Sequence, residues 1–251
     1  MGMAKKSTHA ARVRLPITIP ILRKVLRLFD IANANLCAAD RTAYKAALTN
    51  ATYGLLRVGE ITSPTMARRG GKEMTAADVT AIRDAQGKDT VCYNEVVKAS
   101  KCDKFRQTAT ISLHANGSDT CPVHHLAKWL EVRRALGHST DLPLYTLSGG
   151  KYLTRGAFTK ALRAALDLAG YNSKLYGSHS CRGGGAVSLL SAGASTATIR
   201  CLGRWASMTF LGYLQHIPQG LAADLSARVA NQQESDITSK HHELYSQRFD
   251  A

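Results

Sequence analysis

The stretch YGSHSCRGGGAVSLLSAG, residues 176–193, places a histidine and an arginine directly before three consecutive glycines. Glycines 183–185 have no side chain, so they let the backbone approach another segment of the chain closely. The residues that follow, 186–190, are mostly apolar and indicate a buried helix. His179 and Arg182 therefore lie at the start of a buried helix, where they either stabilise the fold or contact a ligand.

Further helices are indicated on both sides of this stretch by apolar residues at helical spacing. The segments with this pattern are 18–30, 40–62, 121–137, 153–170, 195–203 and 207–217. Residues 90–100 and 108–113 have the composition of short β-strands around the lysine-rich segment KASKCDKFRQ, residues 98–107. Residues 63–90 are polar and contain glycine, which indicates a long surface excursion. The pattern predicts one mostly α domain with a small antiparallel β-sheet, an α+β fold.

The composition favours an anionic partner. The 251 residues carry a formal net charge of +15, and residues 151–216 hold eight basic side chains against one acid. This basic excess favours nucleic acid over a membrane surface, because no apolar run approaches the ~18 residues of a spanning helix. Six cysteines are scattered without a Cys-x-x-Cys pair, which is typical of reduced thiols in an intracellular protein.

Six side chains at different points of the chain could act together on a phosphate. Two arginines can form bidentate hydrogen bonds with its oxygens. A lysine can protonate a leaving oxygen, and a tyrosine can be a covalent nucleophile. An indole N–H can donate to a phosphate oxygen or pack against a histidine. The candidates are Arg57, Lys101, His179, Arg182, Trp205 and Tyr213. Such a set would form a phosphoryl-transfer site that needs neither a metal nor another cofactor.

The order and spacing of these motifs resemble the tyrosine recombinases, the integrase family. LLRVGEIT, residues 55–62, is similar to the family's first arginine motif, and KASKCDKFRQ is similar to its β-hairpin lysine segment. HSCRGGGA, residues 179–186, is similar to the His-x-x-Arg motif, and GRWASMTFLGYL, residues 203–214, to the segment with the nucleophilic tyrosine. Arg182 and Trp205 are 23 residues apart, as in the family. The resemblance is closest to eukaryotic Crypton or DIRS-like mobile-element recombinases.

The resemblance implies a role for each candidate. Arg57 and Arg182 would clamp the scissile phosphate of double-stranded DNA. Lys101 would be the general acid that protonates the 5′ leaving hydroxyl. His179 would hydrogen-bond the phosphate and help to deprotonate the nucleophile, and Trp205 would support the pentacoordinate state.

Tyr213 would form a 3′-phosphotyrosyl link, which a DNA 5′ hydroxyl displaces during ligation, without metal or ATP. Lys98 and Lys104 are alternatives to Lys101 as the general acid, since both lie in the same lysine-rich segment. The resemblance also implies basic residues that contact DNA outside the reacting phosphate. These are Lys98, Lys104, Arg106, Arg155 and Arg204.

The resemblance divides the chain into a basic flexible arm, residues 1–15, a catalytic domain, 16–217, and a helical tail, 218–251, exchanged between subunits. The family usually carries an N-terminal core-binding domain, whereas only some 15 residues precede the resemblance here. We therefore expect that a separate chain can supply this domain and that four copies assemble on DNA. Trp205 and Tyr213 are eight residues apart, one fewer than in bacterial and phage members, which turns the tyrosine on its helix. The protein would act inside the cell, and in the nucleus of a eukaryotic host.

Three other interpretations compete with this one. Cys121, His124 and His125 could suggest metal ligands, but no second pair accompanies them, and adjacent histidines on a helix point in different directions. Residues 195–214 form two short helical patterns joined by a glycine-bearing turn, as in helix-turn-helix DNA-binding modules. The third is a non-catalytic scaffold that descends from a mobile-element recombinase. Covalent trapping of DNA on the protein would separate the enzyme from these alternatives.

Overall fold

The computed structural model describes residues 14–67, 69–98, 108–205 and 211. Three strands, β1 (Val79–Arg83), β2 (Thr90–Val97) and β3 (Ala109–His114), form an antiparallel sheet in the order β1-β2-β3. The helices are α1 (Ile19–Ala32), α2 (Ala38–Tyr53), α3 (Val58–Ile61), α4 (Pro122–Ala135), α5 (Arg155–Leu168), α6 (Ser180–Ser191) and α7 (Thr196–Leu202), with 3₁₀ turns η1 (Ala76–Asp78) and η2 (Ser173–Leu175). The expected mostly helical fold with a small antiparallel sheet is confirmed.

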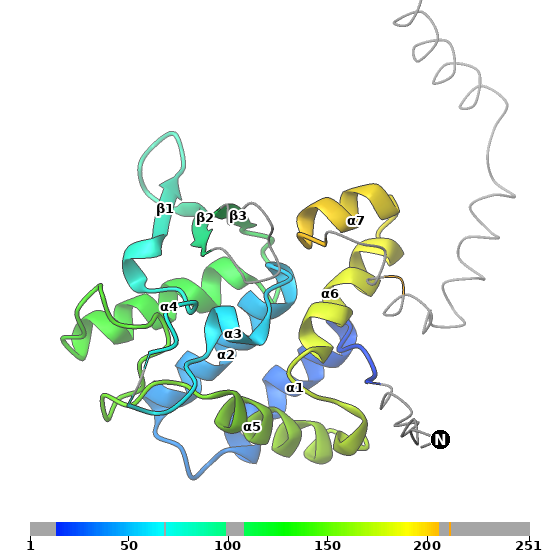
Figure 1. Cartoon of the computed structure of the whole chain (residues 1–251), viewed down its shortest axis with the longest axis horizontal. Helices are drawn as coiled ribbons and strands as arrows, with labels where there is room; N and C mark the ends of the chain where they lie inside the picture. Colours follow the sequence, from blue (N-terminus) through cyan, green and yellow to red (C-terminus); the bar gives the residue numbers. More distant parts are fainter. Residues whose placement is uncertain (1–13, 68, 99–107, 206–210, 212–251) are drawn as a thin grey trace, which may run out of the picture. The chain divides into compact units, whose positions relative to one another are not determined.

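The helices pack around α2, which contacts α4 on one side and α6 on the other (Figure 1). The α4 helix also contacts β2 and β3, and α1 packs against α5. The main core between these elements includes Phe29, Trp129 and Phe158, whose side chains are almost fully buried. A second, smaller cluster lies under α6 and α7 and consists of Leu55, Ala186, Val187 and Ile199. None of the described helices is long and apolar enough to cross a membrane.

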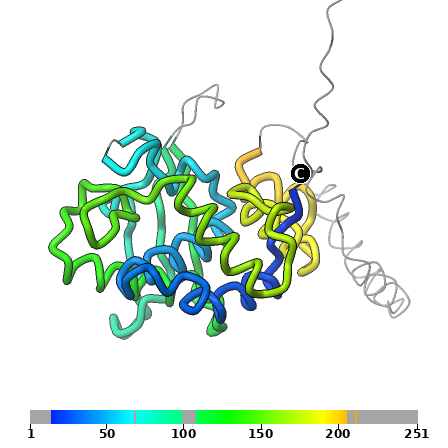
Figure 2. Tube along the Cα trace, turned by 90° about the horizontal axis from the view of Figure 1, so that it is seen from below, coloured from blue at the N-terminus to red at the C-terminus, as the bar shows by residue number. Residues whose placement is uncertain are grey.

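The glycines of α6 allow close backbone packing. A Cβ on Gly184 would lie 1.8 Å from the carbonyl oxygen of Ile17, and one on Gly185 would lie 2.1 Å from that of Thr52. The backbone N–H of Ile17 donates to the carbonyl of Ser180 over 2.8 Å, which holds the N-terminal segment along the start of α6 (Figure 2). The expected close approach is confirmed for these two glycines, and it seats α6 against both α2 and the N-terminal segment.

The helix predicted from residue 40 to around Gly59, within the segment 40–62, is interrupted. The α2 helix ends at Tyr53, Leu55 takes a positive φ of 47°, and α3 begins only after Arg57. A left-handed residue cannot continue a right-handed helix, so the chain turns at this point. The turn is apolar and helix-like in sequence, and its interruption depends on contacts with distant residues that are described below.

The excursion predicted over residues 63–90 contains η1 and β1. Four of the five residues of β1 are exposed, so the strand has no apolar alternation by which the sequence could reveal it. Before it, the buried carboxylate of Glu73 accepts hydrogen bonds from Ser63 Oγ (3.0 Å) and from the backbone N–H groups of Gly70 (2.7 Å) and Lys72 (3.1 Å). This carboxylate folds the loop after α3 back on itself.

Several predicted segments lie outside the described residues. They are the arm over residues 1–15 apart from its last two residues, the helix over 207–217 apart from Leu211, and the tail over 218–251. Most of the lysine-rich segment, residues 99–107, also lies outside them.

Candidate active site

The first arginine is held at the start of a short helix. The backbone N–H of Arg57 donates to Glu60 Oε2 over 2.7 Å, and its Nη1 donates to Glu60 Oε1 over 3.0 Å. Its Nη2 donates to the backbone carbonyl of Arg204 over 3.4 Å. The side chain of Arg57 is still 37% exposed, whereas that of Glu60 is 5% exposed. A buried carboxylate therefore orients Arg57 while part of its side chain stays accessible to a ligand.

The second arginine lies beneath the surface. Arg182 is in the first turn of α6 and is 3% exposed. Its Nη1 donates to the carbonyl of Leu55 over 2.6 Å, and its Nη2 donates to the carbonyl of Gly203. Its guanidinium carbon lies 4.3 Å from the ring centre of Trp205, which is a cation–π geometry. Arg182 thus joins the turn after α2 to the turn after α7.

The turn after α7 folds the indole of Trp205 back over its own backbone. Gly203 ends α7, and a Cβ at this position would lie 1.6 Å from Cζ3 of Trp205. Because glycine has no Cβ, the ring fits over the turn and reaches Arg182. Gly203 is the C-cap residue of α7.

His179 immediately precedes α6, and the positive charges of three arginines act on its pKa. Burial of part of the imidazole is the largest cause that lowers its pKa, and the charges of Arg155, Arg182 and Arg57 lower the pKa further. The residue is nevertheless exposed on its outer side. A lowered pKa keeps the ring neutral at pH 7, and a neutral imidazole has one nitrogen that can accept a proton. The structure therefore brings His179 together with both candidate clamp arginines.

Arg204 is turned into the protein. Its Nη2 lies 2.9 Å from Glu60 Oε2, and its side chain is 15% exposed. Its guanidinium also donates to the carbonyls of Gly54 (3.3 Å) and Leu55 (3.4 Å). The sequence predicts a DNA contact for this arginine, and the structure places its guanidinium among acceptors of the protein itself.

Glu60 is a site residue that the sequence reasoning did not identify. It accepts from Arg57 on both oxygens and from Arg204 on one of them. The signal was present, because an acidic residue three positions after the N-cap residue of a helix is typical of a capping box. In RVGE, residues 57–60, this spacing coincides with the arginine motif.

The lysine-rich segment is described only at its first residue. Lys98 Nζ lies 3.0 Å from Asp78 Oδ2 and donates to the carbonyl of Glu73 over 3.4 Å. Lys98 therefore joins the end of β2 to the excursion before β1. The remaining predicted site residues of this region and of the last motif lie outside the described residues: Lys101, Lys104, Arg106 and Tyr213.

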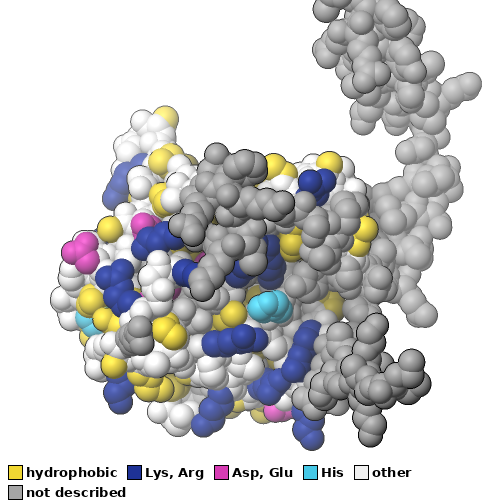
Figure 3. Space-filling model, in the orientation of Figure 1, with side chains coloured by type: hydrophobic (Ala, Val, Ile, Leu, Met, Phe, Trp, Pro, Cys, Tyr) yellow, Lys and Arg dark blue, Asp and Glu magenta, His cyan; other side chains and the backbone are white. Residues whose placement is uncertain are grey.

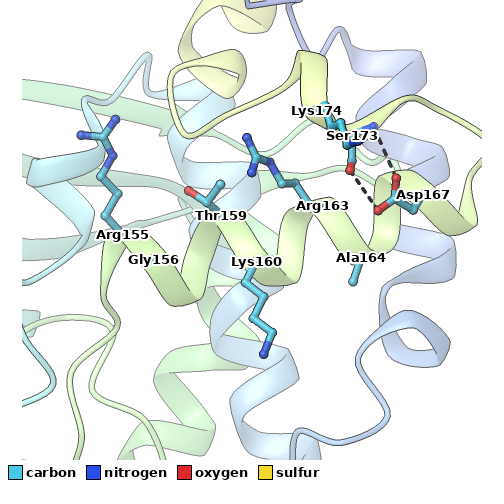
Figure 4. Close-up of a pocket in the computed structure, with 9 residues that line it drawn as sticks. All are labelled: Arg155, Gly156, Thr159, Lys160, Arg163, Ala164, Asp167, Ser173 and Lys174. Atoms are coloured by element: carbon cyan, nitrogen blue, oxygen red, sulfur yellow. Dashed lines mark hydrogen bonds between the residues drawn. The ribbon is translucent and has the colours of Figure 1, made fainter.

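Basic side chains gather on the face that carries this site. Figure 3 shows Lys and Arg around a histidine on the side seen in Figure 1. An open hollow of about 800 Å³ runs along α5, and its lining includes Arg155, Lys160, Arg163 and Lys174. Figure 4 shows Arg155, Thr159 and Arg163 projecting from one side of α5 and Lys160 from the other. A second hollow of about 790 Å³ is lined by the loop after α3 and the first turn of α5.

The residues considered as metal ligands have local contacts. His125 Nε2 lies 3.0 Å from the carbonyl of Asp119, and its ring meets that of His124 edge-on, with centroids 5.4 Å apart. Cys121 Sγ accepts from the backbone N–H of Asn116. Within the described part of the chain, no group of three or more His, Cys, Asp or Glu side chains is placed to hold a metal ion.

Comparison with solved structures shows which known fold this chain has. The chain is similar to the XerH site-specific recombinase in a post-cleavage complex with a palindromic difH substrate (TM-score 0.61, 18% identity, 90% of this chain and 56% of that chain). It is also similar to the XerA recombinase (TM-score 0.60, 15% identity, 88% and 67%). A third match is a lambda integrase dimer bound to a COC' core site (TM-score 0.53, 17% identity, 83% and 50%).

The fold is that of the tyrosine recombinase catalytic domain. The match to XerH and to lambda integrase spans about half of the length of those chains. No family model and no curated protein matches this sequence. The likeness therefore establishes the tyrosine recombinase fold, and the narrower Crypton or DIRS-like resemblance stays a prediction.

Proposed function

We propose that this chain is a tyrosine recombinase, an enzyme that breaks and rejoins DNA through a covalent 3′-phosphotyrosyl intermediate. The observation that carries the proposal is the meeting of Arg57, Arg182 and His179, which come from two elements far apart in the sequence. They meet within a fold that XerH, XerA and lambda integrase share at low identity. The two guanidinium groups supply positive charge where a phosphate gains negative charge during displacement.

In the proposed reaction, the Tyr213 hydroxyl attacks the scissile phosphorus and the bond from phosphorus to the 5′ oxygen breaks. The neutral His179 ring accepts a hydrogen bond or a proton from the attacking hydroxyl, while Lys101 gives a proton to the departing 5′ oxygen. Ligation is the reverse, with a DNA 5′ hydroxyl as the attacking group and tyrosine as the leaving group. The phosphodiester energy stays in the covalent link, so the reaction consumes no ATP.

Lys101 is the preferred general acid within the lysine-rich segment. The ammonium of its rival, Lys98, is already paired with Asp78 at 3.0 Å, beside η1. A lysine in that position serves to hold the excursion against β2. Lys104 stays an alternative, because it lies with Lys101 outside the described residues.

The basic face along α5 is the proposed DNA surface. Arg155 contributes to the electrostatics at His179 and also lines both hollows, so it connects the reacting centre with this face. Contacts of this kind are made to phosphates and position the protein without reading the base sequence. The solved structures of XerH and lambda integrase are complexes with their difH and COC' sites, and we extend this binding to the present chain.

A nicked suicide substrate tests the proposal, because cleavage on it releases a short strand and traps the protein on DNA. The wild-type chain is expected to form an adduct that survives denaturant. Tyr213→Phe keeps the aromatic ring and removes the attacking oxygen, so it should bind the same DNA and form no adduct. Gel analysis of a labelled strand measures both.

Two results would decide against the proposal. Adduct formation by Tyr213→Phe at the wild-type level would remove Tyr213 from the mechanism. DNA binding by the wild type with no adduct on any suicide duplex would favour the alternative, a DNA-binding or scaffold protein without chemistry.

A further inference from the structure

We propose that Arg204 is a positioning residue, which fastens the turn at residues 203–205 to the turn at residues 54–57 and thereby holds Arg57 and Trp205 in place. The proposed effect on DNA cleavage rests on the tyrosine recombinase function above. The fastening itself concerns the conformation of the chain and can be measured without any reaction. The sequence suggests a different role for Arg204, a direct contact with DNA.

The side-chain hydrogen bonds of Arg204 to described residues lead to one short segment. Its side chain pairs with Glu60 (2.9 Å) and donates to the carbonyls of Gly54 (3.3 Å) and Leu55 (3.4 Å). Its own backbone carbonyl accepts from Arg57 Nη2 (3.4 Å). Arg204 is thus bound to the 54–60 segment through both its side chain and its main chain, and these partners lie about 150 residues away in the sequence.

Glu60 shares its carboxylate between two arginines. One oxygen pairs with Arg57 Nη1 (3.0 Å), and the other accepts from the Arg57 backbone N–H (2.7 Å) and from Arg204 Nη2 (2.9 Å). A carboxylate that is 5% exposed needs compensation for its lost hydration, and two arginines supply it. Removing the Arg204 charge would leave Arg57 as the single charged partner of Glu60 among these contacts, and the geometry of Arg57 would change with it.

Backbone conformation is unusual at both ends of this connection. Leu55 (φ 47°) and Arg204 (φ 55°) are the non-glycine residues with positive φ in the described ranges. A left-handed conformation is unfavourable for a residue with a side chain, so it persists where surrounding contacts enforce it. Here the two residues contact each other, and the Leu55 carbonyl also accepts from Arg182 (2.6 Å). The arginine contacts therefore stabilise the two residues that have the unfavourable left-handed backbone conformation, Leu55 and Arg204.

The fastened turn precedes the segment that carries Tyr213. Trp205 follows Arg204 directly, and its indole stacks on Arg182 at 4.3 Å. Arg57, Arg182 and the start of the tyrosine segment consequently share one set of contacts, with Arg204 among them. Misplacement of reacting groups by as little as 1 Å can lower a rate by about 10²-fold. Arg204 would then influence catalysis without touching the substrate.

The test compares Arg204→Met with Arg200→Met. Arg200 is an exposed arginine of α7 that donates to the Trp205 carbonyl (3.3 Å). Among the described residues, its side chain forms no hydrogen bond with the 54–60 segment, so it is a matched control on the same turn. The chain has two tryptophans, and Trp129 is fully buried, so acrylamide quenching reports on Trp205. Arg204→Met should raise the quenching of Trp205 and slow adduct formation on the suicide duplex about 10- to 100-fold. Arg200→Met should resemble the wild type in both.

A salt titration of DNA binding separates positioning from direct contact. A lost phosphate contact lowers the salt slope by about one, whereas a positioning residue leaves the slope unchanged. Wild-type quenching in Arg204→Met, a wild-type adduct rate, or a lower slope would each overturn the proposal. If Arg204→Met does not fold, the same measurements are made on Arg204→Lys. A lysine keeps the positive charge beside Glu60 but lacks the planar guanidinium group of arginine. If the wild type itself forms no adduct, the proposed function fails, and quenching still decides whether Arg204 fastens the turn.

Discussion

At the scale of single residues, the site is a cluster of positive charges around one buried carboxylate. Burial is the largest cause that lowers the pKa of Arg204, Glu60 raises that pKa, and the charge of Arg57 lowers it. Guanidinium groups stay protonated despite such shifts, so the cluster keeps its charge. A site with this surplus of positive charge is suited to a phosphate, which would add the negative charge that Glu60 alone does not supply.

Arg57 is the better of the two clamp arginines for a test, because Arg182 is also a structural link that is 3% exposed. Arg57→Lys keeps a positive charge but loses the planar fork that matches phosphate oxygens. We expect cleavage of the suicide duplex to fall at least ~10²-fold, with DNA affinity nearly unchanged. Arg69→Lys, at an exposed position of the excursion, is the control. Near wild-type cleavage by Arg57→Lys would mean that Arg57 does not clamp the phosphate.

A buried carboxyl group beneath the site, that of Glu95, has a raised pKa. Glu95, on β2, is fully buried, and Asn50 Nδ2 donates to its Oε1 over 2.6 Å. Burial raises the pKa of Glu95 to about 8, although the hydrogen bond from Asn50 and the charge of Arg204 act in the opposite direction. Glu95 is therefore expected to be protonated in the folded protein at neutral pH and ionised in the unfolded chain.

Glu95→Gln should flatten part of the pH dependence of stability. Because the folded-state pKa of Glu95 lies above the unfolded value of 4.5, its contribution is fully present below pH 4.5 and is lost as pH rises through about 8. Glutamine does not titrate, so the variant should gain stability relative to the wild type between these limits, by on the order of a few kcal/mol. Urea unfolding at several pH values measures the difference.

Glu131→Gln, at an exposed position of α4, is the control for this comparison and should run parallel to the wild type. Burial also lowers the pKa of His179, but this residue is present in all three proteins and its effect cancels in the differences. Parallel curves for Glu95→Gln and the wild type would show that Glu95 is ionised in the folded protein.

At the scale of elements, α6 depends on the absence of side chains on one of its faces. The helix approaches the N-terminal segment at Gly184 and α2 at Gly185. Glycines lower intrinsic helix stability, so their presence here is explained by packing rather than by propensity. The same packing sets the position of Arg182, which lies two residues before Gly184 on α6.

Gly184→Ala should strongly destabilise the protein. Its Cβ would lie 1.8 Å from the Ile17 carbonyl oxygen, a backbone atom that moves only with its segment, so we expect a loss of about 3 kcal/mol or more. Gly156→Ala, in the first turn of α5, is the control, since a Cβ there meets nothing within 4 Å. That control should be neutral or stabilising by up to ~1 kcal/mol. Thermal or urea unfolding measures both, and equal stabilities would contradict the packing argument.

At the scale of the whole molecule, the net charge of +15 would dominate the proposed interaction with DNA. The matched part of XerH and of lambda integrase is about half of each chain, so other parts of those proteins are not represented in the comparison. We propose that this chain binds DNA mainly through phosphates, as one partner in an assembly of four copies. The exchange of residues 218–251 between subunits belongs to the same proposal.

Binding by the isolated chain should accordingly be weak, steeply salt-dependent and nearly indifferent to sequence, because counterion release drives it. Arg155→Ala should lower the slope of log K against log salt by about one. Lys128→Ala, an exposed lysine of α4 outside both hollows, should leave the slope unchanged. Fluorescence anisotropy on a candidate target and a random duplex measures these slopes. Tight, salt-insensitive and sequence-selective binding by the chain alone would contradict this account.

Much of the fold follows from local patterns. Apolar spacing predicted α1, α4, α5 and α7 to within a few residues, because a helix that covers a core must repeat its apolar face every 3.6 residues. The site arginines and histidine were found from short motifs, since their roles depend on residue type and spacing. Lys101 and Tyr213 stay predictions, as they lie outside the described residues.

The sequence by itself therefore determined the helical α+β class, the basic character and the identity of the candidate residues. Only the tertiary structure decided the turn at residues 54–57, the inward direction of Arg204 and the sharing of Glu60. Leu55 is held in a left-handed conformation by contacts from Arg182 and Arg204, which are 127 and 149 residues away. Local propensity cannot encode such a conformation, because the free energy that maintains it comes from partners that are adjacent only after folding.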